Sequence, residues 1–496
     1  MKRFLDRCEH FQILPREFSM SLKLYDTLSR SLKRFEPANP PTVSLYACGP
    51  TIYDHAHIGN YRSFLVYDLL HRYLVWSGYN VRFVMNLTDV DDKTILKAAE
   101  AGETIKEYTG PFGKQILEDA EELGILPAEA YPLATDYIEE MISWTQRLIE
   151  NGMAYSTADG SVYFSIGSFP EYGRLKGLDL ETATTVSRVD SDEYEKEDVR
   201  DFVLWKTTKS IDEKVEASWD SPWGRGRPGW HLECSVMSIK ELGETLDIHM
   251  GGEDLVFPHH ENEIAQSEAV TGKPFVRHWV HVKHLVVEGS KMSKSLGNTI
   301  TVRQLLEEGF EPAAIRHQLL SAQYRKELNF TRKDLVASAS AVQRIVDFET
   351  RLSSFGELPV DGEGELSAIS LKTISEFQSV MDDDLNSAEA LAVLFVFINK
   401  ANGELDSGSD IFQGDVDRAL ETLKSMDLVF GLLSIAKETR QIDSSMEVWV
   451  ERLLDERNEA RQNRDFQRAD QIRDELLSKG IALEDSEGGT RWKKSG

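Results

Sequence analysis

The chain has 496 residues, of which 41% are hydrophobic and 28% charged, and this length and composition predict about three globular domains with sizeable cores. The longest uninterrupted apolar run, residues 390–398, is too short to cross a membrane, and no signal peptide is visible. Three cysteines exclude a disulfide framework and favour a reducing cytoplasm. The formal net charge of −28, taken alone, argues against a nucleic-acid partner.

The first half of the chain predicts a β-turn-α-β unit. Alternating apolar residues over 43–47 indicate a strand that ends in a Gly-Pro turn. Apolar residues then recur at helical spacing over 61–76, until a glycine stops the pattern. "VRFVMNL" at 81–87 is typical of a second strand. A strand, a helix and a strand in this order favour a parallel sheet.

The second half of the chain begins with an insertion and ends in helices. Residues 97–220 are mixed and charge-rich, which favours an insertion into the first unit. From about residue 335 the pattern is helical, and one helix begins with Asn386 and Glu389 at capping-box spacing. The last 40 residues predict two helices and a short strand pair around Gly488-Gly489. The expected fold class is therefore α/β, with a helical bundle and a small C-terminal α+β module.

Two motifs are suited to binding phosphate, although the chain has no Walker-type P-loop. The stretch "CGPTIYDHAHIGN" joins the first strand to the following helix, where free N–H groups and the positive helix end favour an anion. "KMSKS" at 291–295 has two lysines and suits a loop that closes on triphosphate. A histidine at a helix start is more often structural, and a lone KMSKS match is equally well a solvated loop. The pairing in this order is much less expected by chance.

This pairing resembles the class I aminoacyl-tRNA synthetases, and within them the cysteinyl-tRNA synthetase family. The resemblance rests on "YACGPTIYD", "NLTDVDDK", "DFVLWK", "PGWHLECS", "DIHMGGEDLVFPHHENEIAQ" and "KMSKSLGN", and extends from about residue 22 to the C-terminus. It implies a Rossmann-like catalytic domain split by a connective insertion. The expected regions are an N-terminal extension (1–20), the first catalytic half (21–110), the insertion (111–222), the second catalytic half with KMSKS (223–300), a stem-contact region (301–345), a helical bundle (346–438) and an anticodon-binding module (439–496).

A zinc site can be argued from the residues themselves. His259 and Glu263 are four residues apart and would share one helix face. With Cys48 and Cys234 they make two sulfurs, one imidazole and one carboxylate, ligands typical of zinc. From the residues alone the alternative, that each thiol is a small buried hydrophobe, stays open. The resemblance implies that these four residues bind one Zn²⁺.

The resemblance also implies residues for ATP and for cysteine. His57, Lys291 and Lys294 are expected to be catalytic. The ATP-binding set is His57, Gly59, Asn60, Gly251, Gly252 and Lys294. The cysteine-binding set is Thr88, Trp230, His249 and Asp254. For Trp230 and His249 the alternative is that they pack in the core. The acidic "TDVDD" is more typical of a helix N-cap than of a magnesium site.

Asn60 departs from the family pattern, because the class I motif usually ends in a second histidine. Asparagine donates and accepts hydrogen bonds but carries no charge. The role of this position is therefore left open, and His57 is the residue expected to face ATP.

The expected reaction is ATP-dependent activation of L-cysteine, followed by transfer to the 3′ end of tRNA(Cys), with Mg²⁺ accompanying ATP. Residues 346–430 carry 18 acids and 5 bases, so we expect tRNA contacts from the insertion rim, the stem region and residues 449–496. A monomer is expected.

The alternatives are a mycothiol-type cysteine ligase with an amino-sugar acceptor and a non-catalytic nucleotide- or RNA-binding paralogue. The long C-terminal region favours tRNA over the amino sugar.

Overall fold

The structure is a computed structural model that describes residues 21–178, 200–292, 298–462, 465–479, 481–486 and 489–494. The expected N-terminal extension and Lys294 of the KMSKS motif lie outside the described residues. Within those ranges no helix combines the length and apolarity needed to cross a membrane.

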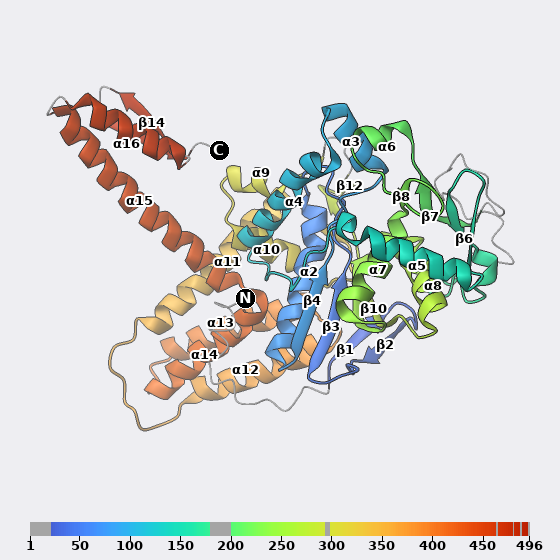
Figure 1. The fold of residues 1–496 in the computed structure, drawn as a ribbon. Coiled ribbons are helices and arrows are strands. Elements are labelled where there is room, and N and C mark those ends of the chain that lie inside the picture. The colour runs from blue at the N-terminus through green and yellow to red at the C-terminus, as the bar shows by residue number, and fades with distance from the viewer. Residues whose placement is uncertain are drawn as a thin grey trace.

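A parallel four-stranded sheet forms the centre of the first region (Figure 1), as the sequence predicts. Its strand order is β10-β9-β3-β4. The strands are β3 (Thr42–Ala47), β4 (Asn80–Met85), β9 (Leu246–Gly252) and β10 (Val276–Val282). The chain leaves β3 in one direction across the sheet and β9 in the other. The carboxyl ends of these two neighbours therefore flank a topological switch point, the usual place for a ligand in such sheets.

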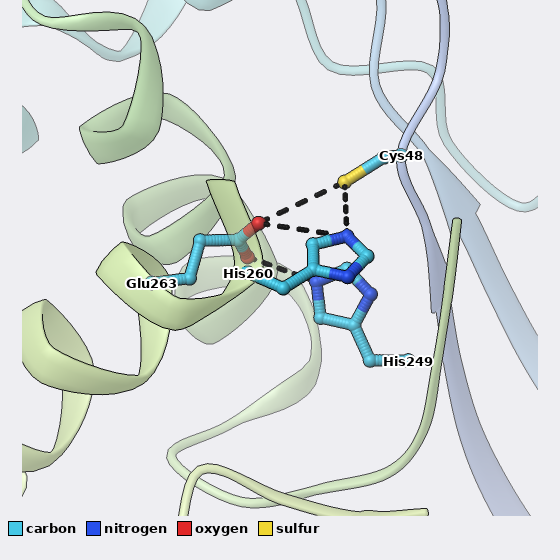
Figure 2. A group of neighbouring side chains, drawn as sticks. All are labelled: Cys48, His249, His260 and Glu263. Carbon is cyan, nitrogen blue, oxygen red and sulfur yellow. Dashed lines mark hydrogen bonds and ion pairs between the residues drawn. The ribbon is translucent and has the colours of Figure 1, made fainter. Parts of the chain in front are cut away.

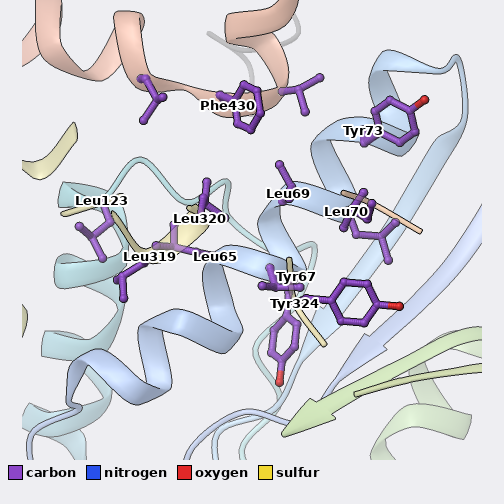
Figure 3. Packing of buried hydrophobic residues seen from close by; sticks show 14 of the residues in the cluster. Leu65, Tyr67, Leu69, Leu70, Tyr73, Leu123, Leu319, Leu320, Tyr324 and Phe430 are labelled. Atoms are coloured by element: carbon purple, nitrogen blue, oxygen red, sulfur yellow. The ribbon is translucent and has the colours of Figure 1, made fainter. Parts of the chain in front are cut away.

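Three helices connect these strands and bring side chains to that edge. They are α2 (Ile58–Trp76), α7 (Trp230–Leu242) and α8 (His259–Thr271). The helix α2 is buried on most sides because it packs between the sheet and the helical region, so its apolar residues are not confined to one stripe. Figure 3 shows its side chains gathered with Leu319, Leu320, Leu123 and Phe430, which belong to the same core.

An insertion separates β4 from α7 and carries its own antiparallel sheet. The sheet has the order β5-β6-β7-β8 and a separate hydrophobic core, to which α7 also contributes. Its strands are β5 (Ala154–Ser156), β6 (Val162–Phe164), β7 (Phe202–Thr207) and β8 (Gly226–Pro228). The helices of this part are α3 (Asp92–Ala101), α4 (Ile105–Glu122), α5 (Ile138–Glu150) and α6 (Ser210–Lys214), with 3₁₀ turns η1 (Ala134–Tyr137) and η2 (Ile166–Ser168).

A small sheet and two helices join the region of the parallel sheet to the bundle. This sheet has the order β12-β11-β13. Its strands are β11 (Leu285–Val287), β12 (Ser290–Lys291) and β13 (Leu328–Phe330), and the helices are α9 (Val302–Glu307) and α10 (Pro312–Leu320). A hairpin of β1 (Lys23–Asp26) and β2 (Ser31–Arg34) packs beside β10.

The C-terminal third is helical and ends in a separate module at the far end of α15 (Figure 1). The bundle consists of α11 (Arg332–Ser353), α12 (Glu365–Asp382), α13 (Ser387–Asp406) and α14 (Gln413–Phe430). Asn386 caps α13 as predicted, since its side chain accepts from the Glu389 N–H. The module contains the end of α15 (Leu432–Gln462), α16 (Phe466–Ser478) and the hairpin β14 (Ile481–Ser486) and β15 (Gly489–Lys494).

Three of the expected region boundaries fall inside helices. The positions after 110, 345 and 438 lie within α4, α11 and α15 respectively. Neighbouring regions therefore share continuous helices rather than meeting at loops, and the boundaries themselves stay a prediction.

Candidate functional site

The turn between β3 and α2 has the geometry of an anion site. His57 is the N-cap of α2: its Nδ1 accepts from the Asn60 N–H at 3.3 Å, and its own N–H donates to Asn60 Oδ1 at 3.1 Å. This reciprocal capping box gives Asn60 a structural role that the sequence left open. The first turn of α2 contains no acidic residue, so no side chain of that turn offsets the positive helix end.

The start of the KMSKS motif lies against this turn. Lys291 is exposed in β12, and the next residue, Met292, reaches Gly59. A Cβ at Gly59 would lie 2.8 Å from Met292 Cε, so glycine permits the close approach. On the other side of the motif, Ile300 O accepts the Ile58 N–H at 2.9 Å. Met292 within the motif and Ile300 beyond it thus both contact the turn that carries His57.

The four metal-ligand candidates named from the sequence come together in the structure. Cys48 follows β3, Cys234 lies in α7, and His259 and Glu263 lie in α8. The Sγ atoms are 3.7 Å apart, and His259 Nε2 is 3.0 Å from Glu263 Oε1. The four donor atoms all lie within 4.8 Å of one another, and all four residues are buried. Two thiols, an imidazole and a carboxylate at this spacing fit a zinc ion.

A second, overlapping group contains two further histidines (Figure 2). It shares Cys48 and Glu263 with the first group and adds His249 and His260. His260 Nε2 lies 3.4 Å from Cys48 Sγ, and His249 Nε2 lies 2.8 Å from Glu263 Oε2. Sequence reasoning did not single out His260. Its signal was the tandem histidine in "PHHENE", where only the first was matched to the i, i+4 carboxylate.

The metal-ligand candidates polarise one another. Burial raises the pKa of Glu263, but the opposing effect of His249 and His259 is larger and brings the pKa down to about 2. Burial likewise raises the pKa of Cys234, while hydrogen bonds from Cys48 and His259 and the charge of His259 bring it down to about 6. Burial lowers the pKa of His259, but Glu263 and Cys234 raise it to about 10. Burial and the neighbouring Cys234 raise the pKa of Cys48 well above its ordinary value.

A chain of hydrogen bonds orients the second histidine of the pair. His260 Nδ1 lies 2.7 Å from His281 Nε2, and His281 Nδ1 lies 2.7 Å from Thr27 Oγ1. Burial lowers the pKa of both imidazoles, that of His281 to about 3, so both rings are neutral. Each neutral ring has one donor and one acceptor, and the chain therefore sets the direction of the His260 ring. The sequence did not reveal His281, because its partners come from distant segments.

The residues expected to bind cysteine lie in different surroundings. Trp230 is 40% exposed and stacks on His259 with ring centroids 4.4 Å apart, so the indole reaches the surface beside the metal-ligand candidates. Asp254 is exposed in η3 (Glu253–Val256). His249 is fully buried and contacts Glu263 and Trp279.

Thr88 is also buried, and its hydroxyl donates to Glu233 Oε2 at 3.0 Å. Of the four residues, Trp230 and Asp254 thus reach the surface, whereas Thr88 and His249 lie within the interior.

The two glycines at the end of β9 allow side chains to pack against the backbone. A Cβ at Gly251 would lie 2.5 Å from Cε1 of His260, and one at Gly252 would lie 2.4 Å from Oδ1 of Asp254. The glycines therefore serve this packing, whatever else approaches them. The predicted N-cap in "TDVDD" is confirmed, because Asp91 caps α3 and accepts from the Lys93 and Thr94 N–H groups.

Three families match successive parts of the chain. Residues 34–340 match the tRNA synthetases class I (C) catalytic domain, residues 376–434 match the DALR domain, and residues 446–492 match the cysteinyl-tRNA ligase anticodon binding domain.

Curated relatives and solved structures are similar over most of the chain. A cysteine–tRNA ligase of Koribacter versatilis is 46% identical over 502 residues, covering 96% of this chain and 100% of the relative. One of Chlamydia muridarum is 46% identical over 482 residues, with the same coverage. Mycobacterium tuberculosis methionyl-tRNA synthetase, in complex with methionyl-adenylate, superposes with a TM-score of 0.58 at 16% identity, covering 78% of this chain and 89% of that one. This last likeness concerns the fold.

Proposed function

The chain belongs to the cysteine–tRNA ligase family, and from that premise we propose that it joins L-cysteine to tRNA(Cys) in two steps. In the first, the cysteine carboxylate attacks the α-phosphate of ATP, so that cysteinyl-adenylate forms and pyrophosphate leaves. In the second, a hydroxyl of the terminal tRNA ribose attacks the carbonyl carbon and AMP leaves. Mg²⁺ enters with ATP.

The observation that carries the cysteine specificity is the buried group of Cys48, Cys234, His259 and Glu263. Serine differs from cysteine by one atom, and shape alone discriminates such pairs by only about 1–3 kcal/mol. One Zn²⁺ held by this group would supply a soft Lewis acid that prefers the substrate thiolate to a hydroxyl. Trp230, which stacks on His259 and is 40% exposed, is suited to close the side of the cysteine pocket.

Activation of the carboxylate needs no protein nucleophile, because the substrate is already ionised. We assign His57, Lys291 and Lys294 to positioning the triphosphate and neutralising charge as pyrophosphate leaves. The capped start of α2, with Gly59 and Asn60, adds a positive helix end, while the N–H groups of Ile58 and Asn60 are already bonded to Ile300 O and His57. Gly251 and Gly252 lie at the switch point and are proposed to line the adenosine site. Thr88, His249 and Asp254 are retained as proposed contributors to the cysteine pocket.

The proposal also covers the oligomeric state, the compartment and the regions that contact tRNA. We propose a monomer in the cytoplasm, where reducing conditions keep Cys48 and Cys234 as free thiols. We assign tRNA contact to the insertion rim, the region after KMSKS and the C-terminal module.

The decisive experiment measures pyrophosphate exchange with cysteine and with serine, together with the zinc content of the same sample. We expect exchange that depends on cysteine, a strong preference over serine, and one zinc per chain. If fully zinc-stripped enzyme activated cysteine normally, the proposed role of the metal would be wrong. Charging of tRNA then separates this function from a ligase that uses an amino sugar.

A further inference from the structure

A run of buried side chains connects the elements that carry the two thiols. Asn86 Oδ1 accepts the N–H of Gly49, the residue after Cys48, at 2.9 Å. Asn86 Nδ2 donates to Thr88 Oγ1 at 3.2 Å. The Thr88 hydroxyl donates to Oε2 of Glu233, the residue before Cys234. Three hydrogen bonds thus run from one cysteine-bearing segment to the other.

Each member of this run is removed from water. Asn86 is 1% exposed, Thr88 2% and Glu233 0%. A buried polar network of this kind rigidifies its surroundings when its bonds are made, and it costs stability when they are lost. The direction of the run is fixed at one end, because the Gly49 N–H is a backbone group that only donates. Asn86 must therefore turn its oxygen to Gly49 and its amide N–H groups to Thr88.

The close approach at Gly49 shows that this arrangement is built into the backbone. A Cβ at position 49 would lie 1.7 Å from the main-chain oxygen of Asn86, so no other residue fits there without movement. Asn86 Oδ1 also accepts a hydrogen bond from the second thiol, Cys234 Sγ, at 3.6 Å. One side chain therefore contacts the segment of the first thiol and the sulfur of the second.

We propose that Asn86 and Glu233 are positioning residues of the metal centre: through Thr88 they fix the spacing of the Cys48 and Cys234 segments so that both thiols meet one zinc ion. The inference rests on the proposed function, which supplies the zinc. The three bonds of the run use no thiol proton, so they remain when the thiols ionise and bind metal, whereas the donation from the Cys234 thiol to Asn86 Oδ1 is given up. Outer groups that orient ligands typically contribute about 10- to 100-fold to metal affinity.

The test compares two asparagine-to-leucine variants of the full-length protein. Asn86→Leu removes the acceptor and the donor of the run while keeping similar size. Asn262→Leu is the matched control, because Asn262 is also 1% exposed, lies on α8 between His259 and Glu263, and bonds to Tyr172 rather than to a metal-ligand candidate. Zinc affinity is measured by competition with a chromophoric chelator. Cobalt substitution then reports, through its thiolate charge-transfer band, how many thiolates bind.

We expect Asn86→Leu to bind zinc about 10- to 100-fold more weakly, with a reduced charge-transfer band, and Asn262→Leu to match the wild type. Wild-type affinity and band in Asn86→Leu would overturn the inference. Equal weakening in both variants would overturn it as well, because the effect would then be general destabilisation.

If Asn86→Leu does not fold, two variants of Glu233 test the same inference. Glu233→Gln keeps an amide oxygen that accepts the Thr88 hydroxyl, whereas Glu233→Leu does not. We expect near-normal zinc binding in the first and weaker binding in the second, and equal behaviour of the two would contradict the inference. If the wild type itself bound no zinc, the proposed metal role and this inference would both fall. Normal zinc binding in every variant would remove the inference alone.

Discussion

At the scale of single residues, Asn60 shows how local geometry resolves a departure from a motif. The sequence pattern raised the question of what replaces the usual second histidine at this position. In the structure Asn60 closes the first turn of α2 by exchanging two hydrogen bonds with His57. Because Nδ1 of His57 accepts one of them, a neutral His57 carries its proton on Nε2. Asn60 therefore fixes the tautomer of the histidine expected to face ATP.

The Asn60→Ala variant is expected to be less stable by about 1 kcal/mol, the usual net value of a lost hydrogen bond, here to the His57 N–H, and to form adenylate more slowly. Asn60→Asp keeps an oxygen for the His57 N–H and should keep the stability, but its charge near the phosphates should slow adenylate formation. Thermal unfolding and pyrophosphate exchange separate the two effects. Equal melting temperatures for Asn60→Ala and Asn60→Asp would show that the cap does not contribute.

His317 provides a prediction about pH. Burial lowers its pKa to about 4, while its Nδ1 lies 2.9 Å from Ser338 Oγ. The unfolded chain, with a pKa near 6.5 at this position, binds more protons between pH 4 and 6.5. The free energy of unfolding is therefore unaffected by His317 above about pH 6.5. As pH falls from there to about 4, the titration of His317 lowers it by up to about 3 kcal/mol by linkage. A His317→Gln variant should show a flatter loss of melting temperature from pH 6.5 to pH 4. Parallel profiles for the two proteins would contradict this.

At the scale of elements, one buried ion group joins the catalytic region to the bundle. Asp68 of α2 pairs with Arg72 Nε at 2.8 Å and with Arg316 Nη2, from α10, at 2.5 Å. The guanidinium groups also donate to carbonyls at the ends of two helices: Arg72 to Gly124 O after α4, and Arg316 to Phe430 O at the end of α14. The helix α2, whose N-cap is His57, is thereby attached to the end of α14.

We expect Arg316→Met to cost about 3–5 kcal/mol of stability, because it leaves a buried carboxylate short of a partner and helix-end carbonyls without a donor. Arg332→Met is the control, since its ion pair with Glu308 lies at the surface. An exposed pair of that kind contributes about 0–1 kcal/mol. Thermal unfolding of both variants checks the expectation, and similar losses would contradict it.

This ion group also marks the limit of the sequence reasoning. The strand, the following helix and the i, i+4 pair His259 and Glu263 could be predicted because each depends on neighbours along the chain. The contacts of Asp68 with Arg316, or of Thr88 with Glu233, join residues far apart in sequence and have no local periodicity. The four zinc-ligand candidates could be argued from their residue types, but nothing in their spacing brings Cys48 to Cys234, and only the resemblance favoured zinc over two separately buried thiols.

At the scale of the whole molecule, the C-terminal module has its own core and is carried by α15. Val450, Leu453, Ile472, Leu476 and Ile481 form that core apart from the bundle. The first part of α15 stays attached to the bundle, where Lys437 pairs with Glu349 and Arg440 bonds to Gln343. The proposed adenylate site and the C-terminal module thus lie in separately packed parts of the chain.

Deletion of residues 442–496 should therefore preserve cysteine-dependent pyrophosphate exchange. Charging of tRNA should fall about tenfold or more, equivalent to about 1.4 kcal/mol of lost binding. Circular dichroism and the exchange assay check that the remaining protein is folded. Intact charging by a folded truncated protein would refute the assigned role of the module.

Because α15 is one continuous helix, the number of its residues sets both the distance and the orientation of the C-terminal module. Its 31 residues correspond to a helix of about 46 Å, at about 1.5 Å per residue, and Figure 1 shows the module at its far end. Adding one residue to its middle would advance the module by that small step but turn it by about 100°. Adding seven would move it by about 10 Å while turning it by only about 20°. A change in the length of α15 therefore alters the orientation of the module around the helix axis more strongly than its distance from the parallel sheet.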